Sequence, residues 1–200
     1  ALFNLAPALA AQGRATEALS AIDRVDAGGA VSDDDAAVPG LRAQLLIALE
    51  RRDEARVVLD RALARIDHPV LRIERARLAD ARHDAAAALA DYRAALLSTP
   101  DEQTALSDLV FLKKRVADWK GLPELQARFR DGVLALAHID QASALTPFSF
   151  LSDPSTRAEQ RIAGEAWSRR FYRLRGEDTH RIASPAPLSE NRLRIGYLSA

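Results

Sequence analysis

Side chains that could bind a metal ion or act in catalysis are present, but their spacing does not group them. The 200 residues include no cysteine, so a disulfide and a thiolate metal site are both excluded. A zinc-type site needs histidines at close, regular spacing, and a general base needs a partner group within hydrogen-bonding reach. The sequence indicates neither arrangement, so we expect no metal site and no catalytic residue within this chain. The scattered histidines are His68, His83, His138 and His180.

Charge and hydropathy argue against two kinds of partner. The chain has 28 basic and 28 acidic side chains, whereas a surface that binds nucleic acid is usually net basic. No apolar run reaches the roughly 18 residues that a transmembrane helix needs. We therefore expect neither nucleic acid nor a membrane as a partner. The absence of cysteine fits a reducing compartment, and we expect a cytoplasmic protein.

Small apolar residues recur at the spacing of a helical-hairpin repeat. Ala18, Ala55 and Ala88 are 37 and 33 residues apart, close to the tetratricopeptide period of about 34 residues. Helices packed as hairpins need a small residue where they cross and larger apolar residues beside it. The sequence thus predicts about three degenerate tetratricopeptide (TPR) repeats within residues 1–100. The repeat's early tryptophan is absent from all three, and an ordinary helical bundle is the alternative.

Beyond Pro100 the apolar pattern changes. It predicts helices over residues 104–117 and 124–138 as a further hairpin that no longer matches the repeat, and a helix from Arg157 to about Tyr172. Residues 101–175 are therefore interpreted as connector helices, and residues 176–191, which contain two prolines, as a linker. Residues 192–200 are apolar and β-prone, which is typical of a buried strand. A single strand is not stable alone, so its partner strands are expected outside this chain.

Three motifs occur in a fixed order after residue 110. They are Phe111-Leu112-Lys113-Lys114-Arg115-Val116-Ala117-Asp118-Trp119, then Thr146-Pro147-Phe148-Ser149-Phe150-Leu151, then Arg192-Leu193-Arg194-Ile195-Gly196-Tyr197-Leu198-Ser199-Ala200. Together with the preceding repeats, they resemble the region that joins the TPR arm to the catalytic half in bacterial O-GlcNAc transferases of the SPINDLY type.

That resemblance implies a larger enzyme with a GT-B fold, whose first Rossmann-like domain begins with the strand at 192–200. Family members transfer N-acetylglucosamine from UDP-GlcNAc to serine or threonine hydroxyls of proteins, with inversion and without a metal ion. No catalytic residue of the family falls within this chain, which ends at Ala200. Pro147, Phe148 and Ser149 would lie near the active-site cleft, or else form a packed connector. Animal members have histidines after this proline, so the donor sugar and the acceptor both stay open.

The arm itself is expected to contact the acceptor protein. A repeat array usually binds an extended peptide along its first helices, and Asn4, Gln44, Arg77 and Asp80 are the candidate residues there. Longer-armed family members use a ladder of asparagines on the peptide backbone, and only Asn4 resembles it. Arginine and glutamine contacts would replace the ladder, or the arm would serve as a spacer.

Two further interpretations stay open at this level. The chain could instead be a stand-alone TPR scaffold that binds a partner protein without catalysis, although such a scaffold has no need of a terminal strand. Trp119 is interpreted as a core residue at a helix turn, with Asp118 capping the segment after it, and a role in joining the arm to a catalytic domain is the alternative.

Overall fold

The computed structural model describes residues 2–27, 36–139 and 147–175. These residues form helices joined by turns, and no strand occurs among them. The bounds are α1 Leu2–Ala11, α2 Ala15–Ala27, α3 Ala37–Ala48, α4 Arg52–Leu63, α5 Pro69–Ala81, α6 Ala85–Ser98, α7 Gln103–Arg115, α8 Leu122–His138, α9 Pro147–Leu151 and α10 Arg157–Arg175. The prediction of a mainly α-helical chain is confirmed. The expected linker 176–191 and strand 192–200 lie outside the described residues.

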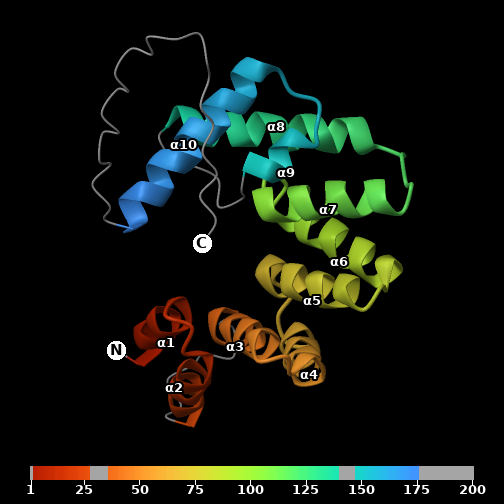
Figure 1. The fold of residues 1–200 in the computed structure, drawn as a ribbon. Coiled ribbons are helices and arrows are strands. Elements are labelled where there is room, and N and C mark those ends of the chain that lie inside the picture. The colour runs from red at the N-terminus through yellow and green to blue at the C-terminus, as the bar shows by residue number, and fades with distance from the viewer. Residues whose placement is uncertain (1, 28–35, 140–146, 176–200) are drawn as a thin grey trace, which may run out of the picture.

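Helices α1 to α8 form four consecutive hairpins that stack on one another (Figure 1). The first helix of each hairpin contacts the first helix of the next, so that α1, α3, α5 and α7 form one continuous row. The second helix of each hairpin contacts the first helix of the next hairpin. We call the exposed side of the α1, α3, α5 and α7 row the helix-A face.

Alanines at the helix crossings allow this close stacking. The alanines at the two crossing positions of the first three hairpins are all fully buried, and each lies where helices pack against one another. A larger side chain there would push the helices apart. The prediction that small residues mark the crossings is therefore confirmed. The alanines are Ala6, Ala43 and Ala76 in the first helices and Ala18, Ala55 and Ala88 in the second.

A left-handed residue ends the first helix of every hairpin. Gly13, Glu50, His83 and Ala117 have φ angles of 75°, 59°, 63° and 57°. In each turn the amide of this residue and the amide of the next donate back to carbonyls of the last helical turn, as in a Schellman motif. The four residues are 37, 33 and 34 positions apart. The repeat period therefore continues through the α7–α8 hairpin.

The fourth hairpin differs from the others in residue size. Val110 and Leu122 occupy the two crossing positions that alanines fill in the earlier hairpins, and they are 1% and 5% exposed. Helix α7 nevertheless contacts α5 and α6 as α5 contacts α3 and α4. The stack therefore continues past Pro100, into the segment that the sequence indicates as connector helices.

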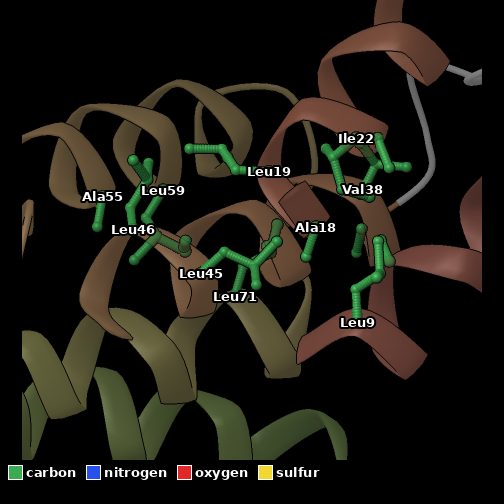
Figure 2. Packing of buried hydrophobic residues seen from close by; sticks show 14 of the residues in the cluster. Leu9, Ala18, Leu19, Ile22, Val38, Leu45, Leu46, Ala55, Leu59 and Leu71 are labelled. Carbon is green, nitrogen blue, oxygen red and sulfur yellow. The ribbon is translucent and has the colours of Figure 1, made fainter. Parts of the chain in front are cut away.

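Two hydrophobic clusters meet at α5. Leu71 and Leu78 of this helix belong to a cluster with α1 to α4, whereas Ile73 and Ala76 belong to a cluster with α6 to α10. Figure 2 shows the first cluster, in which Leu45 of α3 lies beside Leu71 of α5. Helix α5 is thus buried against both halves of the stack.

Helices α9 and α10 cover the end of the stack. Phe150 of α9 is buried edge-to-face against Phe129 of α8, with ring centroids 6.1 Å apart. Just beyond α9, the buried carboxylate of Asp153 accepts a hydrogen bond from Gln126 at 2.7 Å and pairs with Lys114 at 2.8 Å. Asp153 therefore connects α7 and α8 to the segment that leads into α10.

Thr156 caps the start of α10 together with Glu159. The amide of Glu159 donates to Thr156 Oγ1, and the amide of Thr156 donates to Glu159 Oε2. This reciprocal pair is a capping box. The backbone hydrogen bond from Thr156 lowers the pKa of Glu159.

The interpretation of Trp119 as a core residue is wrong. Its side chain is 63% exposed, and the residue lies in the turn between the end of α7 at Arg115 and the start of α8 at Leu122. Asp118 does stabilise the turn as expected, since its carboxylate accepts the amide of Lys120 at 3.3 Å. The buried ammonium of Lys113 also donates to Asp118, and this hydrogen bond lowers the pKa of the Asp118 carboxyl.

Candidate functional site

The residues expected to contact a peptide all lie in the first helices of the hairpins. Gln44 in α3 and Arg77 in α5 occupy the same repeat position, six residues before the left-handed turn residue. Asp80 lies one helical turn after Arg77. Asn4 lies in α1, nine residues before the turn, and its side chain is outside the described residues. The structure therefore places Gln44, Arg77 and Asp80 on the helix-A face.

Glu74 connects Gln44 to Arg77. Gln44 Nε2 donates to Glu74 Oε1 at 2.7 Å, and Arg77 Nη1 donates to the same oxygen at 3.4 Å. Only the NH₂ group of an amide can donate to a carboxylate, so the carbonyl oxygen of Gln44 is turned away from Glu74. Glu74 is 6% exposed. A buried carboxylate thus orients two side chains from neighbouring helices.

Arg77 extends this network to the next hairpin. Its Nε donates to Asp108 Oδ2 of α7 at 2.8 Å, and the hydroxyl of Tyr92 in α6 donates to the same oxygen at 3.4 Å. Burial disfavours the charge on Arg77, but Asp108 and Glu74 outweigh it and raise the pKa of the guanidinium. Burial and the charge of Asp108 raise the pKa of Tyr92. The charge of Asp108 therefore stabilises the ionised form of Arg77.

A second pair lies one helical turn further along. Arg115 of α7 pairs with Asp80 of α5, and its guanidinium carbon lies over the ring of Phe111, 5.8 Å from the centroid. Phe111 occupies the repeat position of Gln44 and Arg77 and is 59% exposed. On α7 the row therefore presents an aromatic ring where α3 and α5 present polar groups.

The helix-A face combines partly exposed guanidiniums with a buried carboxylate. The guanidiniums of Arg77 and Arg115 are on side chains that are 40% and 44% exposed, whereas the side chain of the carboxylate partner Glu74 is 7% exposed. Among the described residues, no group of histidines and carboxylates could hold a metal ion. The helix-A face instead offers fixed hydrogen-bonding groups and one exposed ring.

The near-cleft candidates lie on α9. Pro147 begins this helix, Phe148 is 80% exposed, and the carbonyl of Ser149 accepts a hydrogen bond from Ser152 at 3.1 Å. Lys114 of α7 donates to the carbonyl of Ser152 at 2.9 Å. This contact places the end of α9 beside α7. A catalytic cleft near these residues stays a prediction.

Two surface clefts occur away from the helix-A face. One, of about 330 Å³, lies between α4, α5 and α6, and the other, of about 410 Å³, between α2, α3 and α4. Both are lined by arginines and carboxylates that pair with each other, as Arg75 does with Asp60 at 3.0 Å and Asp91 at 2.7 Å. Most of these charges are paired within the fold, and no candidate residue lies in either cleft.

Sequence reasoning did not identify several residues of the helix-A face. Glu74 and Asp108 occupy the repeat position of Asn4, and Phe111 that of Gln44. Aligning the first three hairpins on Ala18, Ala55 and Ala88 would have placed Glu74 at the position of Asn4. The fourth hairpin has Leu122 in place of that alanine, so the sequence contains no clear signal for Asp108 and Phe111.

Comparisons with known proteins show no family for this chain. No protein-family model matches it, and no curated protein does. Among solved structures, the chain is similar to the TPR domain of Sgt2 from Aspergillus fumigatus, with 16% sequence identity over 76% of this chain and 89% of that chain, and a TM-score of 0.44. Within the part of the chain that the structure describes, no helix is long and apolar enough to cross a membrane.

Proposed function

We propose that this chain is a protein-binding arm that holds an extended peptide segment on its helix-A face. The observation that supports this most is the buried Glu74, which fixes Gln44 and Arg77 in defined orientations on an exposed face. Because burial of a charge is costly unless it is paired, Gln44 and Arg77 are held at the Glu74 carboxylate, and their remaining polar groups face the exposed side.

The two oriented side chains suit a peptide backbone. The amide oxygen of Gln44 can accept a peptide N–H, and Nη2 of Arg77 makes no hydrogen bond to any described residue, so it can donate to a peptide carbonyl. Packed helices are about 8–10 Å apart, which corresponds to about three residues of extended chain. One peptide strand can therefore contact Gln44 and Arg77 together.

Selection from a random peptide library displayed within a carrier protein tests this proposal. Peptides selected on the 200-residue chain are synthesised, labelled and titrated by fluorescence anisotropy. We expect Gln44→Leu to weaken binding about fivefold, which corresponds to one hydrogen bond of about 1 kcal/mol. Gln12→Leu is the matched control, because Gln12 is exposed in the α1–α2 turn, away from the helix-A face.

Two results would contradict this function. One is a library that yields no binding peptide. The other is a set of peptides whose affinity changes equally with Gln44→Leu and Gln12→Leu. Circular dichroism of each variant verifies that the helices are retained.

We further propose that the arm belongs to a protein O-glycosyltransferase that uses UDP-GlcNAc. The support is the resemblance of the three ordered motifs, at 111–119, 146–151 and 192–200, to the arm–catalytic junction of that family. In such an enzyme the arm would hold the acceptor close to the donor sugar, and proximity of this kind contributes directly to rate. A stand-alone scaffold is the alternative.

The natural full-length protein distinguishes these two functions. It is incubated with UDP-GlcNAc and a protein extract, and the acceptors are analysed by mass spectrometry for an added N-acetylhexosamine. We expect transfer by the wild type, and Gln44→Leu should reduce transfer to proteins while leaving hydrolysis of UDP-GlcNAc unchanged. An absence of both transfer and hydrolysis would contradict the enzyme and leave the scaffold.

A further inference from the structure

Three arginines of α5 share one arrangement of their guanidinium groups. Each of the three that contact neighbouring helices bridges two carboxylates, which is within the capacity of five N–H donors. The pairs are Arg72 with Asp67 and Asp91, Arg75 with Asp60 and Asp91, and Arg77 with Glu74 and Asp108. Two carboxylates per guanidinium is therefore the usual arrangement along this helix.

Arg115 of α7 has one carboxylate partner among the described residues, which is Asp80. Its side chain is 44% exposed, compared with 23% for Arg72, 31% for Arg75 and 40% for Arg77. The position of its guanidinium is defined by Asp80 on one side and by the Phe111 ring on the other. The guanidinium can therefore donate hydrogen bonds to a second carboxylate, supplied by a ligand, with little loss of side-chain freedom.

Phe111 provides an apolar surface next to this cation. Its ring is 59% exposed and lies at the repeat position of Gln44 and Arg77. A peptide that runs along the row from α3 to α5 reaches Phe111 next. Exposed aromatic side chains with restricted orientation are common energetic centres of interfaces.

We infer that Phe111 and Arg115 form a side-chain subsite that binds a large apolar residue beside an acidic residue of the peptide. This inference rests on the proposed function and specifies the peptide that the arm prefers. The charge argument favours an acidic neighbour, because the group exposed beside the ring is a guanidinium whose own carboxylate, Asp80, is half as exposed, at 22%. We assign the carboxylate to an Asp or Glu side chain within the peptide.

The same displayed library tests the subsite. Its peptides have no free C-terminus, so a carboxylate that Arg115 binds must belong to an Asp or Glu side chain. We expect the wild type to select an aromatic or branched aliphatic residue adjacent to Asp or Glu. In titrations of the selected peptide, made with an amidated C-terminus, Phe111→Ala should weaken binding about tenfold. Phe111→Leu, which keeps an apolar side chain, should weaken it less.

Arg115 is tested by changing both sides of the contact. Replacing the acidic residue of the peptide by its amide should weaken binding to the wild type about fivefold. With Arg115→Gln, the acidic and amide peptides should bind equally. Leu97→Ala and Arg161→Gln are the controls, since Leu97 is 84% exposed on α6 and Arg161 is 79% exposed on α10.

The outcomes separate this inference from the function on which it rests. Peptides that depend on Gln44 but not on Phe111 or Arg115 would overturn the subsite and keep the peptide-binding arm. A preference for basic neighbours would also overturn the subsite. A library without any binding peptide would overturn both the subsite and the peptide-binding function.

Discussion

At the scale of single residues, the turn residues define where each first helix ends. Glu50, His83 and Ala117 have positive φ angles that L residues adopt at a cost of about 1–2 kcal/mol. The two hydrogen bonds of each turn offset that cost. Gly13 adopts the same conformation without this steric cost.

The Ala117→Gly variant is expected to be more stable than the wild type. Glycine removes the steric strain of the left-handed conformation, and after its larger loss of chain entropy the free energy of unfolding should rise by about 0.5–1 kcal/mol. Urea denaturation measures this change. Ala135→Gly is the matched control: Ala135 is exposed within α8, and the same substitution there should lower stability by about 1 kcal/mol. A fall in stability for both would show that the turn is not strained.

At the scale of elements, the contacts of Asp153 attach α9 and α10 to the stack. Its side chain is 3% exposed and pairs with Lys114, which is 24% exposed. Removing one partner of a buried ionic pair leaves the other group without compensation. The attachment of the last two helices therefore depends on Lys114.

Lys114→Met should loosen this end of the molecule. We expect the free energy of unfolding to fall by about 1–3 kcal/mol, and hydrogen exchange to speed up in α9 and α10 more than in α3 and α4. Lys120→Met, in the exposed α7–α8 turn, should change neither quantity. Unchanged exchange in α9 and α10 of the Lys114 variant would show that the Lys114–Asp153 pair does not anchor them.

The elements also show how far sequence reasoning extends. The first three hairpins could be predicted because Ala18, Ala55 and Ala88 recur at spacings of 37 and 33 residues, close to the repeat period. The fourth could not be recognised as a repeat because Val110 and Leu122 resemble ordinary core residues. The prediction for Trp119 failed because large aromatic residues are usually buried, and no local signal marks an exposed one.

Part of the candidate site was also beyond sequence reasoning. Gln44 and Arg77 could be placed on the helix-A face from the repeat alone. The role of Glu74 could not be predicted, because an acidic residue on a helix is usually solvated. Its two partners also lie at different distances from it along the chain. Gln44 is 30 residues away and Arg77 is three. Only the packing of α3 against α5 brings the three together.

At the scale of the whole molecule, the stack has two hydrophobic clusters that share α5. Repeat arrays gain stability from neighbouring repeats rather than from one central core. Damage to one cluster should therefore spread less than it would in a globular domain.

Leu59→Ala and Phe129→Ala should each destabilise a different end of the molecule. Both side chains are buried, Leu59 in the first cluster and Phe129 in the second, and each substitution should cost about 2–5 kcal/mol. Hydrogen exchange is expected to accelerate mainly in α1–α4 for Leu59→Ala and mainly in α7–α10 for Phe129→Ala. Equal acceleration throughout in both variants would indicate one cooperative unit.

The differences within one repeat position have a consequence for any strand that runs along the helix-A face. Successive first helices present Pro7, Gln44, Arg77 and Phe111 at equivalent places. A row of identical side chains would let a bound strand slip by one hairpin at no energetic cost. Here each slip would exchange a hydrogen-bonding contact for an apolar one, so the array would hold its ligand in a single register and a single direction.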